Sequence, residues 1–356
     1  MGLKRNILYS GFLTTSLYIF QLITYPYVAR VLGVTNIGIC NFVQSIVQYF
    51  SLFAMLGIST LGVREIAKCN GDKEKLNNTF SQLFTLNLSF TVIVTLLYIG
   101  AVLFVPQFAP YKELLYIGAS QLLFGTFAIE WLFRGIEDFK YITVRTLFVR
   151  FAYVISIFLF VRDYNDYDVY FIIYSGMIIA NGVINWNYRR KFVKFSIQPF
   201  SAIKKYIKPY LYLGSQLILT SLYTTFNIVY LGMMCGDVQV GYYTTATKIE
   251  NIILALYTSV TLVLLPRISA LMESGNKEGI NHVIRLSFGL LFAFVFPCLV
   301  FTECFTEGVV SLVAGSGYEG AVLPMKIVMP VMLIVGMEQV LIVQILMQAG
   351  QTSKCL

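Results

Sequence analysis

The sequence predicts an all-α polytopic membrane protein built from two parallel copies of one helical repeat. Of its 356 residues, 57% are hydrophobic and only 12% are charged, and the mean hydropathy is +0.73. Soluble domains carry about 25% charged residues. Apolar runs long enough to cross a bilayer recur along the chain, and a stretch near the N-terminus returns 203 residues later without a gap. Together these observations predict a membrane protein with an internal duplication.

The apolar runs predict ten membrane spans, because about twenty apolar residues cross a bilayer as a helix. The predicted spans cover residues 6–29, 37–62, 80–105, 113–133, 145–161, 168–187, 208–232, 239–266, 284–304 and 321–348. Residues 306–316 form either a separate short helix or the end of the ninth span.

The duplication relates the first two spans to the seventh and eighth. It contains ten identities over sixty positions, including three glycines and one arginine in fixed register: Gly11, Gly33, Gly38 and Arg64 match Gly214, Gly236, Gly241 and Arg267. Six spans separate the start of one copy from the start of the other. Because six is even, the copies run in the same direction, as in transporters with parallel repeats. We expect the last two glycines of each copy to form tight turns between paired helices.

The distribution of cations predicts a cytoplasmic N-terminus. With the N-terminus inside, the inner segments hold 21 of the 26 Lys and Arg residues, as the positive-inside rule requires. The other five are Arg30, Lys112 and Arg162 in outer segments, and Lys248 and Lys326 within spans. Acids dominate the outer loops: Asp163, Asp166, Asp168, Asp237, Glu307 and Glu319. The net charge of +8 therefore indicates topology, and no nucleic-acid partner is needed to explain it.

The inner segment 188–208 predicts the boundary between two bundles. It carries seven cations and no acid, and it contains Pro199. We expect a six-span bundle at 1–187, a cationic cytoplasmic hinge at 188–207, and a second bundle at 208–356 with four spans, which is incomplete relative to the first. The hinge either rests against anionic lipid or makes a specific regulatory contact.

Cysteine and histidine usage offers no cofactor or metal site. The six cysteines are scattered, mostly within apolar runs, and form no CxxC pair, and His282 is the one histidine. We expect the cysteines to behave as small hydrophobic residues.

Several sequence runs resemble the polysaccharide-repeat-unit flippases (O-antigen type) of bacterial envelopes. These runs are YPYVARVLGVTNIG at 25–38, LGVREIAK at 61–68, EWLFRGIEDFKYI at 130–142, LVLLPRISAL at 262–271, AGSGYEGAVLPMKI at 314–327 and ILMQAG at 345–350. The resemblance covers essentially the whole chain and the order of spans. The family belongs to the same superfamily as the multidrug and toxin extrusion (MATE) transporters, so the resemblance implies a MATE-like fold. Its members usually have twelve to fourteen spans.

The resemblance implies a transporter, without a cofactor, in the bacterial cytoplasmic membrane. Its cargo would be an undecaprenyl-pyrophosphate-linked oligosaccharide, moved by alternating access of two bundles for surface polysaccharide biosynthesis. Membrane lipids and the glycan polymerase machinery are the further partners that it implies.

Such a cargo needs cations for its phosphates inside the membrane, where charged side chains are costly and mark function by default. Lys248 lies deep in the eighth span and is either a cavity cation or a member of a structural ion pair. Lys326 lies near the outer end of the tenth span, where it could also snorkel to the surface. Arg30 ends the first span and either faces a cavity mouth or anchors the helix at the interface.

Other charged residues are candidates for either a structural or a functional role. Arg64 and Arg267 occupy equivalent repeat positions and either follow topology or capture phosphate at the inner mouth. Glu130, Arg134 and Glu137 have the spacing of one helical face, which favours a ladder of ion pairs. Glu250 is two residues from Lys248 and on another face. Glu338, near Gln339 and Gln344, is either a coupling-ion carboxylate or the partner of a cation.

Two other functions compete with the flippase. A cation-coupled multidrug exporter of the same fold would favour acids in its cavity, whereas the cations above favour an anionic cargo. A membrane glycan polymerase or ligase would need catalytic groups, and the one acid cluster is RDYNDYD at 162–168. Tyr223, Tyr242 and Tyr243 could stack on sugar rings.

Overall fold

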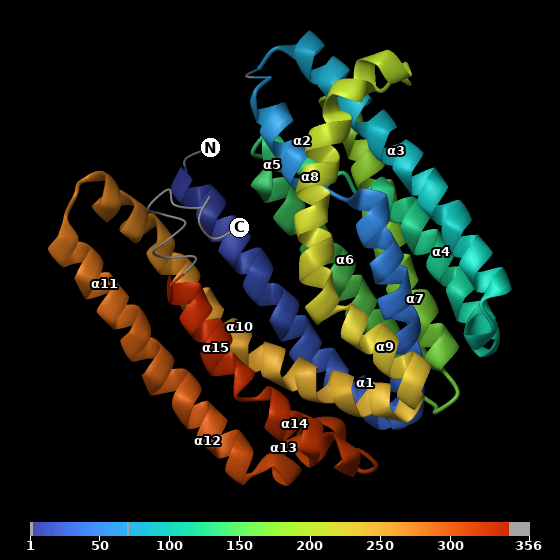
Figure 1. Ribbon diagram of the computed structural model, residues 1–356, viewed down its shortest axis with the longest axis vertical. Helices are drawn as coiled ribbons and strands as arrows, with labels where there is room; N and C mark the ends of the chain where they lie inside the picture. The colour runs from blue at the N-terminus through green and yellow to red at the C-terminus, as the bar shows by residue number, and fades with distance from the viewer. Residues whose placement is uncertain (1–2, 70, 342–356) are drawn as a thin grey trace. The chain divides into compact units, whose positions relative to one another are not determined.

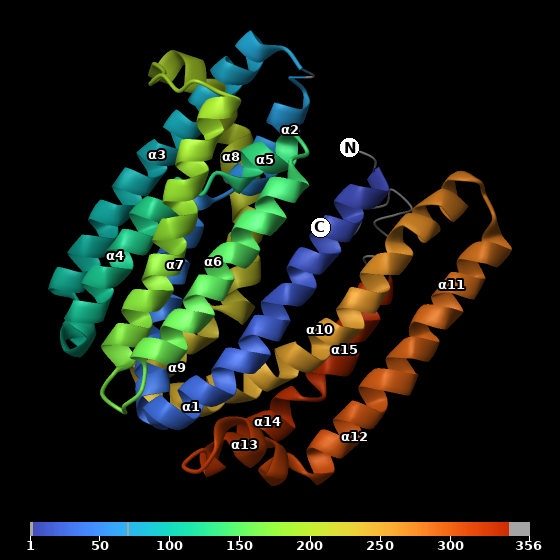
Figure 2. The same ribbon diagram turned by 180° about the vertical axis from the view of Figure 1, so that it is seen from behind.

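The computed structural model describes residues 3–69 and 71–341, and every regular element in these ranges is helical. The chain divides into two units, which Figures 1 and 2 show from opposite sides. Unit 1 comprises Met1–Tyr9 and Thr35–Val240, and unit 2 comprises Ser10–Val34 and Gly241–Leu356. The all-α, polytopic fold class predicted from composition is confirmed.

Unit 1 contains the long helices of the first repeat together with the first helices of the second. Its elements are the second part of α1 (Leu3–Met55), α2 (Ile58–Ala67), α3 (Lys73–Phe104), η1 (Pro106–Tyr111), α4 (Lys112–Thr126), α5 (Glu130–Gly135), α6 (Phe139–Phe160), α7 (Tyr167–Tyr188), η2 (Arg189–Lys191), α8 (Phe200–Thr224) and α9 (Phe226–Cys235). In this unit α4 packs against α3 and α7, and α6 packs against α7.

Polar side chains hold the helices of unit 1 together. On α3 the buried face carries hydroxyls and amides, among which Thr91 Oγ1 lies 2.7 Å from Thr126 Oγ1 of α4. Tyr98 donates to the backbone carbonyl of Leu115 at 2.8 Å. Interhelical hydrogen bonds of this kind are usual in membranes, where apolar contact alone gives little preference for one helix partner.

Unit 2 contains the first part of α1 and the remainder of the second repeat. Its elements are α10 (Asp237–Glu273), α11 (Lys277–Leu290), the π-helical segment η3 (Leu291–Val295), α12 (Phe296–Cys304), α13 (Thr306–Ala314), η4 (Glu319–Ala321), α14 (Val322–Val328) and α15 (Val331–Glu338). The π segment ends two residues before Pro297, which lacks an N–H and disturbs the preceding helical turn. Residues 306–314 form a separate short helix, which settles the open choice for 306–316.

The repeat glycines make the same bend in both copies. Gly33 breaks α1 with φ 69° and ψ 171°, and Gly236 separates α9 from α10 with φ 81° and ψ 177°. This backbone region is essentially restricted to glycine. The turn predicted for Gly33 and Gly236 is therefore confirmed. Gly38 and Gly241 lie inside helices instead, and Gly241 permits close approach of Val34, whose carbonyl oxygen would clash with an added Cβ.

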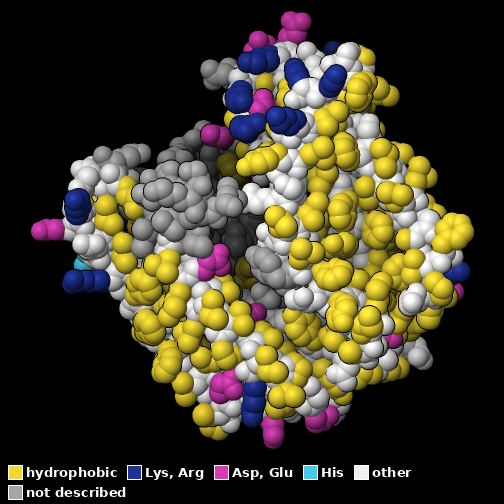
Figure 3. All heavy atoms as spheres, in the orientation of Figure 1, with side chains coloured by type: hydrophobic (Ala, Val, Ile, Leu, Met, Phe, Trp, Pro, Cys, Tyr) yellow, Lys and Arg dark blue, Asp and Glu magenta, His cyan; other side chains and the backbone are white. Residues whose placement is uncertain are grey.

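Apolar side chains on the outer faces identify the membrane-spanning surface. Leu97 on α3 and Phe148 on α6 are 63% and 71% exposed, and Figure 3 shows apolar side chains over most of the visible face. Among the described residues, seven helical stretches are long and apolar enough to span a membrane, or eight if the bent pair α8 and α9 counts as one span. The predicted count of ten is therefore too high for the described residues: the first two predicted spans fall in a single stretch, Ser16–Ala67, because the helix resumes directly after Gly33, and the eighth, in α10, is not among these stretches. Residues 342–348 of the tenth predicted span lie outside the described residues.

The composition of the two units differs from the division expected at 188–207. The first helix of repeat one (residues 10–34) belongs to unit 2, whereas α8 and α9, the first helix pair of repeat two, belong to unit 1. Within unit 1, Tyr210 of α8 is fully buried and contacts Ala54 O at 3.0 Å and Asn87 Oδ1 at 2.9 Å through its hydroxyl. The two repeats thus exchange their first helices, and the predicted hinge remains a prediction.

Basic side chains gather at one end of unit 1, where α2 connects to α3 and α7 connects to α8 (Figure 3). The exposed cations in these two connections and in the helix ends beside them include Lys68, Lys73, Lys75, Arg190, Lys191, Lys194, Lys204, Lys205 and Lys208. They are the residues that the positive-inside rule assigns to one side of the membrane.

Candidate functional site

Lys248 lies against a buried tyrosine of unit 2. Its Nζ is 4.5 Å from the centroid of the Tyr25 ring, and Tyr25 is 4% exposed. The Tyr25 hydroxyl lies 2.6 Å from Thr245 Oγ1. Since Thr245 donates its own proton to Gly241 O at 2.7 Å, Tyr25 is the donor to Thr245. A half-buried ammonium on an aromatic face is stabilised by the ring quadrupole, so the first part of α1 supports the charge of α10.

Arg30 extends from α1 to the end of α13 within the same unit. Its Nη2 donates to Leu312 O at 2.5 Å, two residues before the last residue of that helix. The carbonyl end of a helix carries partial negative charge and favours a cation. Gly315, with φ 90°, ends the helix, and a Cβ at this position would lie 3.0 Å from Arg30 Cγ. The exposed guanidinium of Arg30 is thus fixed at the end of α13.

A network of charged and polar side chains joins three helices of unit 1. Glu130, at the start of α5, accepts from Arg134 Nη2 at 3.4 Å and from Arg145 Nη2 of α6 at 2.8 Å. The Arg145 side chain is 3% exposed. Its Nη1 donates to Asn181 Oδ1 of α7 at 2.5 Å, and its Nε has no hydrogen-bond partner among the described residues. This network therefore connects α5, α6 and α7.

The same network corrects the predicted ladder of Glu130, Arg134 and Glu137. The Glu130–Arg134 contact is present, but α5 ends at Gly135, and Glu137 lies in the following turn with φ 61°. The i to i+7 relation needs a continuous helix, so Glu137 does not lie on the expected face. The third charged residue of the network is Arg145, which pairs with Glu130.

Arg145 was not among the site residues predicted from the sequence, because it was assigned to the inner segment between two predicted spans. A signal was available on α7, where Asn181 and Asn185 lie one helical turn apart and interrupt an apolar run. Asn185 Oδ1 accepts from Tyr141 OH of α6 at 2.8 Å, and its Nδ2 donates to Ala128 O. Both asparagines thus face polar groups of neighbouring helices.

The remaining predicted residues are spread over both units. Arg64 is exposed and pairs with Glu65 at 3.1 Å. Arg267, Lys326 and Glu338 are exposed, and Glu250 is buried in α10. Tyr242 packs against Gly320, and Tyr243 is half-buried. Gln344 and the side chain of Tyr223 lie outside the described part of the structure. The structure therefore brings Lys248 to Tyr25 in unit 2 and Glu130 to Arg134 in unit 1.

The acid cluster of RDYNDYD forms a turn. The backbone N–H groups of Arg162 and Asp163 both donate to Asp166 Oδ2 at 2.8 Å, and these two bonds lower the pKa of Asp166. A carboxylate that is occupied by backbone donors stabilises the turn between α6 and α7. Within the described residues, no group of three or more His, Cys, Asp or Glu side chains is placed to hold a metal ion.

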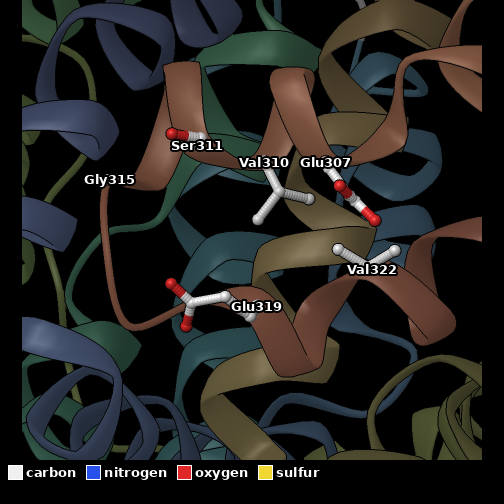
Figure 4. Close-up of a pocket in the computed structure, with 6 residues that line it drawn as sticks. All are labelled: Glu307, Val310, Ser311, Gly315, Glu319 and Val322. Atoms are coloured by element: carbon white, nitrogen blue, oxygen red, sulfur yellow. The ribbon is translucent and has the colours of Figure 1, made fainter.

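Each unit contains a cavity. The cavity of unit 2 has a volume of about 450 Å³ and is lined by Glu307, Val310, Ser311, Gly315, Glu319 and Val322 (Figure 4). Its two carboxylates come from α13 and η4, so it is unsuited to phosphate. The cavity of unit 1 has a volume of about 240 Å³ and contains no charged side chain in its described lining.

These features define a polytopic, all-helical membrane protein with ionised side chains held inside its apolar units. Residues 3–272 match the family model described as "Polysaccharide biosynthesis protein". The chain belongs to this family, which confirms the resemblance inferred from its motifs.

Two relatives extend the match over most of the chain. One from Escherichia coli K12, provisionally named an O-antigen transporter, is 24% identical and covers 98% of this chain and 84% of its own. A relative from Shigella dysenteriae with the same provisional name is 25% identical, and the match covers 87% of this chain and 76% of the relative.

Solved structures share the fold. An inward-facing multidrug resistance MATE family transporter of the MOP superfamily aligns with a TM-score of 0.65 at 16% identity, covering 97% of this chain and 86% of that one. An outward-facing structure of the same description aligns with a TM-score of 0.59 at 15% identity, covering 99% and 83%. The predicted MATE-like fold is confirmed.

Proposed function

We propose that the protein is a flippase that moves a lipid-linked oligosaccharide across the bacterial cytoplasmic membrane for surface polysaccharide biosynthesis. Membership of the polysaccharide biosynthesis protein family carries this proposal. The names of the two relatives and the transporter-like fold support the same function. The proposed carrier is undecaprenyl pyrophosphate, whose long tail can remain in lipid while its head group crosses.

The head group determines which side chains the protein must supply. A pyrophosphate is anionic and a glycan is rich in hydroxyls, and both lose favourable hydration in hydrocarbon. Lys248 and Arg30 of unit 2 are the proposed phosphate ligands. Lys248 lies on the Tyr25 ring, and Arg30 donates to the carbonyl end of α13, so both contacts orient a cation through a group that carries no full charge. Arg64, Arg267 and Lys326 are secondary candidates, and Glu130 and Arg134 are proposed as structural ion pairs.

Transport would proceed by alternating access, with the two units moving as bodies. The polar networks inside each unit favour this proposal, because they connect helices that would otherwise slide independently. The proposed orientation places the N-terminus and the cationic connections of unit 1 in the cytoplasm. Glycan polymerase machinery on the outer side is the proposed consumer of the product.

One observation favours a second candidate, a cation-coupled multidrug exporter. The cavity of unit 2 contains Glu307 and Glu319, which suit a cationic ligand. A membrane polymerase or ligase has less support, since Asp166 of the acid cluster is already bound by backbone donors.

A translocation assay in vesicles tests the cation proposal. We expect Arg30→Ala and Lys248→Ala each to lower the initial rate of lipid-linked oligosaccharide transfer by about tenfold or more, since one hydrogen bond to a charged group contributes about 1.5–3 kcal/mol. Lys277→Ala, which removes an exposed cation at the start of α11, is the matched control. Undiminished transfer in both variants would remove these residues from the cargo site.

A further inference from the structure

The cavity of unit 1 combines free volume with polar walls inside the apolar part of the molecule. It lies between the second part of α1, α4 and α7, and all of its described lining belongs to unit 1. Its lining consists of Gln44, Gln48, Ser51, Ala54, Met55, Gln121, Leu122, Gly125, Tyr174 and Ile178. Three glutamines, a serine and a tyrosine thus face one space between apolar helices.

One acceptor in this wall lacks a donor among the described residues. Gln121 is 3% exposed, and its Nε2 donates to Gln44 Oε1 at 3.1 Å and to Ser175 Oγ at 2.9 Å. Ser175 gives its own proton to Phe171 O at 2.8 Å, so it can only accept from Gln121 and thereby fixes the orientation of the amide. Gln121 Oε1 is left without a hydrogen-bond partner. Buried acceptors are normally paired, whereas this oxygen is free to accept a hydrogen bond from a molecule in the cavity.

The walls determine the chemistry of that ligand. None of the described lining residues is ionised, which favours a neutral ligand over a phosphate or an ammonium. An amide presents a donor and an acceptor side by side, which complements the neighbouring hydroxyls of a sugar ring. Tyr174 adds an aromatic side chain, and Leu122 and Ile178 add apolar surface. At roughly 30 Å³ for each water molecule, the cavity of about 240 Å³ holds about eight waters, which is the scale of one sugar ring.

We propose that this cavity binds one neutral sugar residue of the glycan, with a sugar hydroxyl donating to Gln121 Oε1 and Gln44 and Gln48 binding neighbouring hydroxyls. The proposal rests on the proposed function, because it assumes that the cargo carries a glycan. The proposal assigns a different part of the cargo to each unit. Unit 2 supplies cations for the phosphates, and unit 1 supplies amides for the sugar.

Labelling of a thiol introduced into the cavity wall tests occupancy directly. In reconstituted Ser51→Cys protein, a hydrophilic maleimide is applied with and without the soluble oligosaccharide released from the source strain's carrier lipid. Peptide mass spectrometry then separates the label at position 51 from the native cysteines. We expect the oligosaccharide to slow labelling at this position at least fivefold. We also expect Gln121→Leu in the same background to abolish the protection.

Two further variants make the result specific. Gln44→Leu should also weaken protection. Gln82→Leu should not, because Gln82 is an equally buried amide of unit 1 that donates to Asn78 and does not line the cavity. Thermal unfolding of each variant identifies loss of fold. Absence of labelling without sugar, absence of protection, or protection that survives both Gln121→Leu and Gln44→Leu would overturn the proposal and leave the cavity to water.

Transport in vesicles separates this site from the proposed function. We expect Gln121→Leu to raise the KM for lipid-linked oligosaccharide about five- to tenfold, the loss expected for one hydrogen bond. If wild-type protein moves no lipid-linked oligosaccharide but sugar still protects position 51 of the Ser51→Cys variant, the function fails and the sugar site stands. If the wild type transports and Gln121→Leu has the same KM, the sugar site fails and the function stands.

Discussion

At the scale of single residues, Arg145 is a buried charge with partners on two other helices. It joins Glu130 and Asn181 from two different helices at 2.8 and 2.5 Å. Arg134 contacts the same carboxylate from the surface at 3.4 Å, with a side chain that is 53% exposed. Two arginines with one shared partner therefore differ mainly in burial, and burial should decide their contributions to stability.

We expect Arg145→Met to lower the free energy of unfolding by about 3 kcal/mol, at the lower end of the range for breaking a buried pair, since Glu130 remains 35% exposed. Arg134→Met should cost about 0–1 kcal/mol, as exposed pairs do. Denaturation in detergent measures both. Adding Glu130→Gln to Arg145→Met should recover part of the lost stability, because the neutral amide replaces a carboxylate that would otherwise lack its buried partner. Equal losses for the two arginines would contradict this account of the network.

Residue chemistry could be predicted from sequence where it follows spacing along one helix, as for Glu130 and Arg134. It could not be predicted where it depends on a partner from another helix. Arg145 faces Glu130 only because α5 ends at Gly135 and α6 turns back alongside it. The support of Lys248 by Tyr25 likewise joins residues that are 223 positions apart.

At the scale of helices, the two copies of the repeat share the same backbone conformation at one glycine. Gly33 and Gly236 have nearly the same dihedral angles, and each joins the first helical segment of its repeat to the second. Hydropathy located most of the spanning helices, because apolar length determines whether a segment can span a bilayer. It could not foresee that the first two predicted spans form one stretch, Ser16–Ala67. It could not locate α5 as a separate short helix, since the break at 127–129 lies in an apolar run.

We expect Gly33→Ala and Gly236→Ala each to destabilise the protein by about 1–3 kcal/mol, because a side chain is strained at these dihedral angles. Gly100→Ala is the matched control. It lies inside α3 with nothing within 4 Å of an added Cβ, and the exchange should stabilise the helix by up to about 1 kcal/mol. Thermal unfolding in detergent measures the stability of all three variants. A neutral Gly236→Ala would mean that the bend is not maintained in the membrane.

At the scale of the whole molecule, the two repeats exchange their first helices. Residues 10–34 belong to unit 2, and α8 and α9 belong to unit 1. Close packing supports this assignment within unit 1, where a Cβ on Gly57 would lie 2.6 Å from Tyr210 O, and one on Gly214 would lie 2.7 Å from Leu56 Cβ. Sequence could not predict the exchange, because hydropathy states which segments enter the membrane and not which segments pack together.

The exchange predicts that neither half of the chain is stable alone. A fragment of residues 1–187 lacks α8 and α9, and a fragment of residues 188–356 lacks the first part of α1. We expect each fragment to aggregate when expressed by itself and both to be recovered as a complex when they are expressed together. Size-exclusion chromatography distinguishes these outcomes. A fragment 1–187 that is monodisperse and unfolds at the temperature of the whole chain would argue for independent bundles divided at 188–207.

The central claim is that this protein moves a glycan on a lipid carrier and not a cationic drug. The measurement that tests it most directly is leaflet accessibility in vesicles that contain only the purified wild-type protein. The same vesicles receive either lipid-linked oligosaccharide or a cationic dye, and protein-free vesicles give the background. The account predicts transfer of the oligosaccharide above background with no transfer of the dye. Transfer of the dye with no movement of the oligosaccharide would contradict it.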